Sequence, residues 1–419
     1  MPFNKTNNGI FVDTPYLLDH GAFIFTTQQE NRVMDQTIHK NIQNIVLSLV
    51  LLLIFPSLQA AEIKLSGFAS FVGGRAIKQS TLADGSDATF VADNIYANIN
   101  GRPNDASRYS DKLSFRPDTT IGLQIHAALS QGLNATAQIK GTGANNFNAD
   151  LEWAFLTYEL SEHMTLQAGR MRLPLFFYSD FLDVGYAYHW IRPPTAVYRL
   201  PISSYEGASI KFKGGLGPWD SALRVYGGNG ISENALLGDF NARDMLGIEL
   251  STSNSWLQLR MSVLNGDFFT RGTTTGEDNP IDAMFAGASV HMNLNKAFLM
   301  AEATITKIND DYLDLFNSLL QTDYNESYIL SAGYEIGDFT PHISYTEIKT
   351  ELTGDLNPIF EGVTNRSNTL IVGLRWDFHP AAALKLEYSS VTESDNVFRA
   401  AVGKTGETDI VNVGLDIVF

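Results

Sequence analysis

The sequence contains no cysteine, so neither disulfide bonds nor thiolate metal sites are available. Basic residues are few: 29 Lys and Arg stand against 46 Asp and Glu, and the formal net charge is -17. This balance argues against nucleic acid as a partner, because phosphates require a basic footprint. Only one long apolar run is present, near residue 50, which excludes a helical membrane protein. A transmembrane β-barrel is not excluded, since its strands show only alternating hydrophobicity.

Motifs for enzymatic chemistry are also missing from the sequence. It has no GxSxG, no HExxH and no phosphate-binding loop, and its eight histidines are scattered. We therefore expect no catalytic residues, no metal site and no cofactor.

The apolar run Ile45–Phe55 has the length of a signal-peptide core and is too short to span a bilayer comfortably. Small residues follow it, and we expect cleavage after Ala60, with Ala61 as the second choice. Met34 is a sensible start for this segment. The predicted division of the chain is an over-extended or unusual leader at 1–33, a signal peptide at 34–60 and an exported domain at 61–419.

Short segments of alternating hydrophobicity recur along the rest of the chain. In Thr119–Leu129 and Leu133–Lys140, apolar and polar residues alternate on either side of the Gln131–Gly132 turn, which predicts a β-hairpin. The same pattern predicts four further hairpins: Met245–Leu250 with Trp256–Val263, Phe285–Leu294 with Phe298–Thr306, Tyr328–Ile336 with Phe339–Thr346, and Thr369–Phe378 with Leu384–Ser390.

Short turns alternate with long polar connections. This asymmetry is typical of outer-membrane barrels, whose periplasmic turns are short and whose external loops are long. The segments number about sixteen, an even number that permits antiparallel closure. The predicted fold is therefore all-β, a transmembrane antiparallel barrel with a third external loop that folds inward. The predicted long connections are Arg75–Ser110, Gly141–Ala149, Arg170–Ser204, Gly227–Ala242, Asn265–Ala283, Lys307–Asn325, Lys349–Ser367 and Thr392–Gly406.

Aromatic residues near the strand ends predict contact with a membrane interface, where one edge of the ring is wet and the other apolar. We expect them on the outer apolar face, with an apolar core as the alternative. The rings in question are Trp153, Trp219, Trp256, Phe298, Tyr334, Phe339, Trp376 and Phe378.

The segment from Arg170 to Gly207 lacks alternation but is rich in aromatics, prolines and arginines. Long ordered loops in a regular β chain are usually functional. We expect this loop, 172–204, to narrow the channel, because arginines and carboxylates facing each other set a transverse field that selects among solutes. Alternatively, the arginines pair with the aspartates and fix the loop to the wall. Strand parity points Arg170 outward, which makes it a weaker candidate. The predicted constriction residues are Arg172, Arg192, Arg199, Asp180, Asp183, Glu206 and Arg170.

Polar positions that alternate with the apolar ones are predicted to face the lumen. Acidic residues nearly balance the basic ones there, so the barrel wall alone gives no strong ion preference. The predicted basic lumen-lining residues are Lys140, Lys211, Lys213, Arg224, Arg260, Arg375 and Lys385.

Several segments together resemble Gram-negative outer-membrane porins: the opening strand Ile63–Gly74, the stretch GRMRLPLFFYSDFLDVGYAYHWIRPP, Ser204–Phe212 and the terminal Phe419. The segments are similar to those of a porin group of marine γ-proteobacteria, itself distantly similar to phosphate-selective porins. The resemblance implies a sixteen-stranded barrel, usually trimeric, with the third external loop as an eyelet. It also identifies Phe419 as the signal read by the barrel assembly machinery. A dense ladder of lysine and arginine is absent, so phosphate selectivity does not transfer.

We therefore predict a water-filled channel for passive diffusion of small hydrophilic solutes and ions, embedded in outer-membrane lipid and lipopolysaccharide and forming a homotrimer. Two alternatives stay open, namely a barrel that serves mainly for binding or adhesion, and an anion- or phosphate-selective channel. A barrel enzyme is a third class, but no histidine stands in a suggestive setting beside a serine or aspartate.

Overall fold

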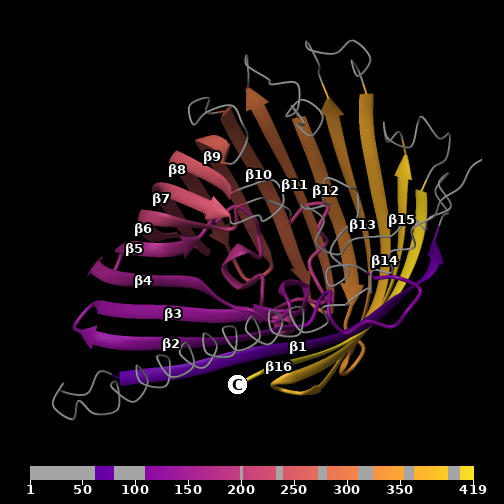
Figure 1. The fold of residues 1–419 in the computed structure, drawn as a ribbon. Helices are drawn as coiled ribbons and strands as arrows, with labels where there is room; N and C mark the ends of the chain where they lie inside the picture. The colour runs from indigo at the N-terminus through magenta and orange to yellow at the C-terminus, as the bar shows by residue number, and fades with distance from the viewer. Residues whose placement is uncertain are drawn as a thin grey trace, which may run out of the picture. The chain divides into compact units, whose positions relative to one another are not determined.

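The computed structural model describes residues 62–79, 109–198, 202–232, 239–271, 281–309, 324–352, 363–394 and 406–419. The leader and signal peptide predicted for 1–60 lie outside the described residues. The described residues form sixteen antiparallel strands (Figure 1). Their bounds are β1 Glu62–Gln79, β2 Thr120–Ser130, β3 Leu133–Thr142, β4 Ala149–Ser161, β5 Met164–Arg172, β6 Ser204–Leu216, β7 Trp219–Ser232, β8 Asp239–Ser253, β9 Leu257–Arg271, β10 Ile281–Leu294, β11 Ala297–Asn309, β12 Tyr324–Tyr334, β13 Phe339–Leu352, β14 Val363–His379, β15 Ala382–Ser394 and β16 Gly406–Val418.

Each strand pairs with its neighbours in the sequence, and β1 pairs with β16 to close the barrel. The pairing confirms the predicted fold class and the predicted hairpins, including Gln124 opposite Gln138 in β2–β3. At the seam, Phe419 exchanges two backbone hydrogen bonds with Gly67, at 2.8 and 3.0 Å. No helix in the described ranges is long and apolar enough to cross a membrane.

The period-two pattern separates the two faces of the wall. On β12, Ile329 is buried inside, whereas its neighbours Tyr328 and Leu330 face outward and are exposed. Apolar residues cover the outer face of a transmembrane barrel because lipid surrounds it. The exposed large apolar side chains therefore mark the membrane-facing surface.

Two of the predicted interface aromatics face inward instead. Trp153 is buried against the guanidinium of Arg172, 5.1 Å from the ring centre. The β3–β4 pairing shifts register at Glu152, because Gln138 faces Trp153 while Ile139 faces Leu151. This bulge inserts one residue and turns both Glu152 and Trp153 into the lumen. The outward prediction for Trp153 was thus wrong.

Phe298 also faces inward, so the outward prediction was wrong for this ring as well. Its ring centre lies 4.5 Å from that of His189 inside the barrel. The buried Met300 and Glu302 follow on the same face of β11. By contrast, Trp256, Tyr334, Phe339, Trp376 and Phe378 are exposed.

The connection between β5 and β6, called the internal loop below, spans 173–203 and folds into the barrel (Figure 1). Residues 199–201 are outside the described part. It contains two short 3-10 helices, η2 (Ser179–Phe181) and η3 (Gly185–Ala187). The inward-folded third loop of the predicted fold is therefore confirmed.

Candidate functional site

The internal loop carries its own apolar core, which continues into the barrel wall. Phe176 packs against Tyr198 of the loop and Phe285 of β10, with ring centres 5.0 and 5.4 Å apart. Tyr178 packs edge-on against Trp190 at 5.7 Å, and Trp190 is fully buried. Burial of aromatic rings contributes strongly to the stability of the folded state, so a loop with such a core is rigid.

Ion pairs attach the loop to the wall at β3, β4 and β5. Asp183 accepts from Lys140 Nζ at 3.1 Å and pairs with Arg172, which also pairs with Glu152. Lys140 Nζ lies 2.7 Å from Glu152 Oε2, so two cations and two carboxylates form one closed network. Burial raises the pKa of Asp183, but Arg172 and Lys140 outweigh it and hold that pKa well below its usual range. The carboxylate of Asp183 therefore stays charged.

A second ionic cluster lies beside η2. Asp180 is 3.5 Å from Arg224 and 3.7 Å from Arg260, and both arginines lie 3.6 Å from Glu249. Burial raises the pKa of Asp180, but the two arginines lower it below its usual value. The Asp180 side chain remains 50% exposed, unlike its partners on the wall. Asp180 is thus a charged loop group that retains access to solvent.

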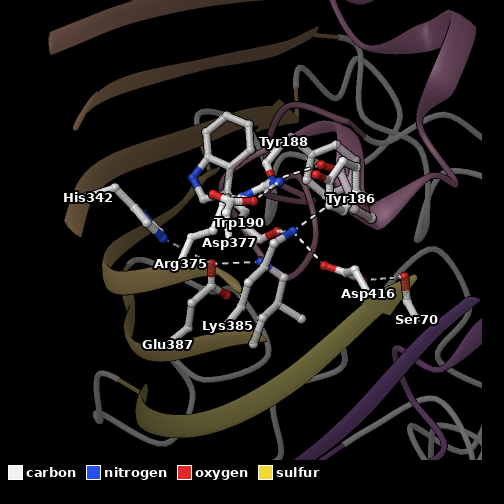
Figure 2. Close-up of polar contacts among 12 residues, drawn as sticks. Ser70, Tyr186, Tyr188, Trp190, His342, Arg375, Asp377, Lys385, Glu387 and Asp416 are labelled. Carbon is white, nitrogen blue, oxygen red and sulfur yellow. Dashed lines mark hydrogen bonds and ion pairs between the residues drawn. The ribbon is translucent and has the colours of Figure 1, made fainter. Parts of the chain in front are cut away.

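The tip of the loop is anchored on the wall formed by β14, β15, β16 and β1, as Figure 2 shows. Lys385 Nζ donates to the carbonyls of Gly185 at 2.7 Å and Trp190 at 2.5 Å, and it pairs with Asp416 at 2.7 Å. Ser70 Oγ donates to the other oxygen of Asp416 at 2.6 Å. A Cβ at position 185 would come within 2.2 Å of Asp416, so only glycine allows this approach.

Arg375 holds the same tip from β14. Its Nη1 donates to the carbonyls of Tyr186 at 2.8 Å and Tyr188 at 2.6 Å (Figure 2). Its Nε and Nη2 donate to Asp377, the bidentate geometry for which a guanidinium is suited. Tyr186 Oη donates to the carbonyl of Pro380 in the β14–β15 turn at 2.9 Å. The loop therefore reaches down to the short-turn end of the barrel.

Wall residues also receive the backbone and rings of 189–191. The Ile191 amide donates to Glu387 at 2.8 Å, and the Trp190 indole donates to Ser344 at 2.8 Å. His189 shares a hydrogen bond with Ser331 at 2.9 Å. Burial lowers the pKa of His189 well below its usual value, as do nearby His342 and Lys385. His189 is therefore neutral near pH 7.

Glu302 of β11 fixes the two ends of the loop together. It accepts from the Phe177 amide at 2.8 Å and from the Tyr198 hydroxyl. Burial raises the pKa of Tyr198 well above its usual value, so the hydroxyl stays protonated and donates. On β9, two strands further along the wall, Ser262 Oγ donates to the Leu175 carbonyl at 2.6 Å. Contacts of the loop thus extend from β3 around the wall to β1.

The structure brings together most of the predicted site residues, largely as ion pairs. Arg192 lies 3.1 Å from Asp118, while Arg199 lies outside the described residues. Arg170 pairs with Glu206 at 3.8 Å on the other face of the wall, away from the loop, as strand parity indicated for Arg170. Neither Arg170 nor Glu206 therefore belongs to the ion pairs that attach the internal loop to the wall. Lys211 and Lys213 face the lumen from β6 and keep exposed surface.

Several anchoring residues were not among the predicted sites. Alternation on β12 and β13 indicates that Ser331 and Ser344 face inward, but serine carries no signal for a particular partner. Asp118 precedes β2, in a stretch without alternation. The described residues hold no group of three or more His, Cys, Asp or Glu side chains arranged for a metal ion.

A closed barrel that is apolar outside, polar inside and narrowed by an inward loop defines an outer-membrane channel of the porin class. The family model for Gram-negative porins matches residues 48–416, and the chain belongs to this family. It is a general diffusion channel of the Gram-negative outer membrane and not an enzyme.

Solved porins share this fold at low sequence identity. OmpF of Salmonella typhi, in complex with daunomycin, is 12% identical with a TM-score of 0.54, over 86% of this chain and 98% of that chain. The anion-selective porin from Comamonas acidovorans is 13% identical with a TM-score of 0.52, over 86% and 100%. OmpT of Vibrio cholerae, in its trimer form, is 9% identical with a TM-score of 0.50, over 86% and 100%. No curated protein matches the chain.

Proposed function

We propose that the internal loop is the sieve of this channel. Small hydrophilic solutes and ions then cross the membrane only through the opening that remains between the loop and the barrel wall. The observation that carries the proposal is the loop's attachment to opposite sides of the barrel, at Asp183–Lys140 on β3 and at Phe177–Glu302 on β11. A loop fixed on two opposite sides cannot swing aside as solutes pass. Passage is then passive and limited by size and charge.

The charges that solutes meet are those that keep exposed surface. Arg172 and Lys385 are buried in ion pairs, Lys140 is largely enclosed in one, and all three act as anchors in this proposal. Asp180, at 50% exposure, and Arg192, at 33%, remain accessible. In the described part of the loop, one exposed carboxylate and one exposed guanidinium support a transverse field rather than a strong preference for one sign of ion.

Single-channel recording in planar bilayers tests the proposal. Purified, folded protein should conduct in steps, and reversal potentials in a salt gradient should give weak selectivity. Strong anion selectivity, reduced by added phosphate, would favour the anion- or phosphate-selective alternative. Absence of conductance from the folded barrel would instead favour a binding or adhesion role.

The trimer form of OmpT, which shares this fold, supports a homotrimer here. Detergent-purified protein should then have the mass of three copies by light scattering, and should fall to one copy after boiling. A single copy before boiling would contradict the trimer.

Export and assembly complete the proposal. The expected cleavage after Ala60 leaves Ala61 directly before β1, which supports removal of 34–60, and 1–33 would be absent from the mature protein. Phe419 closes the β1–β16 seam, consistent with a signal for the assembly machinery. Intact mass of the membrane-inserted protein tests the first point. Deletion of Phe419, with barrel yield measured, tests the second.

A further inference from the structure

The outer surface of β10–β14 contains an apolar groove of about 440 Å³. Ala301 and Ala332 form part of its floor, and larger side chains border it, including Leu299, Leu330, Ile343 and Leu370. The alanines alternate with leucines in register, since Ala301 faces Leu330 and Ala332 faces Leu299. A volume of this size falls in the range of roughly 300–1,000 Å³ that small-molecule sites occupy.

A polar cluster lies directly above this groove on the same outer face. Tyr345 lines the groove and donates through its hydroxyl to Glu347 at 3.0 Å, as does Tyr328. Arg366 Nε lies 3.1 Å from the other oxygen of Glu347, and the Arg366 side chain is 48% exposed. The guanidinium is thus oriented by Glu347 but not enclosed.

Height along the wall identifies the membrane level of these groups. Tyr345 is seven residues from Asp338 in the short β12–β13 turn, which places it ~16 Å above that turn at ~3.3 Å per residue and a tilt of about 45°. Arg366 pairs with Lys349 on β13, and Lys349 is eleven residues from Asp338. By the same estimate, Arg366 lies ~26 Å above the turn. The apolar band of such barrels is about 25 Å tall. The groove therefore lies within the band, and the cluster lies at its external margin.

The chemistry of the occupant follows from this arrangement. An apolar slot within the band accepts a hydrocarbon chain. An exposed arginine at the headgroup level can bind a phosphate by donating two parallel hydrogen bonds to its oxygens. Glu347 can accept hydrogen bonds from sugar hydroxyls beside that phosphate. These features together match a phosphorylated, acylated sugar in the external leaflet.

A neighbouring porin subunit fits this face less well. The charged pair Arg366–Glu347, at 3.1 Å, stands on the outer face directly above the groove. Further pairs stand on the outer face of β15, β16 and β1, namely Lys78–Glu407 at 2.5 Å and Ser390–Asp409 at 2.7 Å. Such groups suit hydrated headgroups rather than a packed protein interface, whose core is depleted of charge.

We propose that this groove binds one acyl chain of a phosphorylated glycolipid of the outer leaflet, with the lipid phosphate on Arg366. The site is separate from the channel, because its residues project from the outer face of the wall.

Two variants test the two halves of the site, with diphosphorylated lipid A as the probe. Ala332→Phe fills the groove, and Arg366→Gln removes the charge. Ala208→Phe adds the same ring to an outward position on β6 and is the matched control. Native mass spectrometry of detergent-purified protein should show one retained lipid A per subunit in wild type and control, and at least tenfold weaker retention in Ala332→Phe.

The Arg366→Gln variant should lose the preference for diphosphorylated lipid A over its dephosphorylated form while still retaining the acylated sugar. Inorganic phosphate alone should not compete at millimolar concentration. Equal retention in Ala332→Phe and Ala208→Phe would overturn the proposal, as would loss of oligomers in Ala332→Phe, which would mean that a subunit covers the groove. Channel conductance, measured in parallel, should be the same in all variants.

Discussion

Removing the lysine that anchors the loop tip should loosen the sieve without unfolding the barrel. Lys385 is fully buried and holds Gly185 and Trp190 through their carbonyls. A single Lys385→Met change would leave Asp416 as a buried, uncompensated charge, which costs about 3–5 kcal/mol. The double variant Lys385→Met/Asp416→Asn avoids that cost and isolates the effect on the loop.

The magnitude follows from the two lost bonds. Hydrogen bonds to a charged group contribute about 1.5–3 kcal/mol each. Two of them correspond to about 3–6 kcal/mol, and 1.4 kcal/mol is tenfold in an equilibrium constant, so the tip should leave its anchor roughly 10²–10⁴ times more often. Arg375 and Glu387 still hold Tyr188 and Ile191. We therefore expect brief openings rather than permanent release.

Single-channel recording should show larger mean conductance and increased open-channel noise in the double variant. Lys213→Met is the matched control, since it removes a lysine from the inner face of β6 and leaves the loop anchor intact. A folded double variant with the noise and conductance of this control would refute the anchoring role of Lys385.

Three further perturbations test other contacts of the loop. Gly185→Ala should displace η3, because the added Cβ would meet Asp416 at 2.2 Å, and conductance noise should rise while Ala187→Gly leaves it unchanged. Asp183→Asn leaves Arg172 and Lys140 with only Glu152, so thermal stability should fall and reversal potentials should move toward anions; unchanged selectivity would mean that ions do not sense this network. The pKa of His189 is depressed in the docked loop. Below about pH 6.5 the unfolded chain therefore binds a proton at His189, whereas the docked loop does not. Loop docking should therefore weaken as the pH falls from 7.5 to 5, seen as rising noise, and His189→Gln should flatten this dependence.

The alternation of apolar and polar residues predicted correctly which side chains face outward on most strands of the wall. Its failures have local structural causes. Alternation is strictly local, so it identified the hairpins and the outward side of Arg170. Trp153 broke the rule because one extra residue at Glu152 reverses the faces, and nothing in the local sequence marks that bulge. Arg172 turns inward to Asp183 at the last position of β5, where the pleat no longer constrains it.

Sequence patterns could not predict which wall residues contact the internal loop. Asp183 meets Lys140, and Gly185 meets Lys385, only because the loop crosses the closed barrel. The predicted alternative, that arginines and aspartates pin the loop to the wall, describes Arg172 with Asp183 and Arg224 with Asp180. Whether the same groups also set selectivity stays a prediction.

Because the loop's charges also hold it in place, neutralising one of them changes docking and field together. The Arg192–Asp118 pair offers a way to separate the two effects. Arg192 is 33% exposed, whereas Asp118 is buried at 6% and accepts from Tyr109 at 2.7 Å. The swap Arg192→Asp/Asp118→Arg keeps one ion pair and the same net charge, but it replaces the exposed cation with an exposed anion.

If docking survives, conductance noise should match wild type while the reversal potential moves toward cations. Arg192→Gln alone should move it in the same direction by a smaller amount, with some increase in noise from the unpaired Asp118. A reversal potential unchanged in the quiet double variant would mean that ions pass out of range of Arg192. At physiological salt that range is about 8 Å, the Debye length. The sieve would then have to lie beside Asp180, the other exposed charge in the described part of the loop.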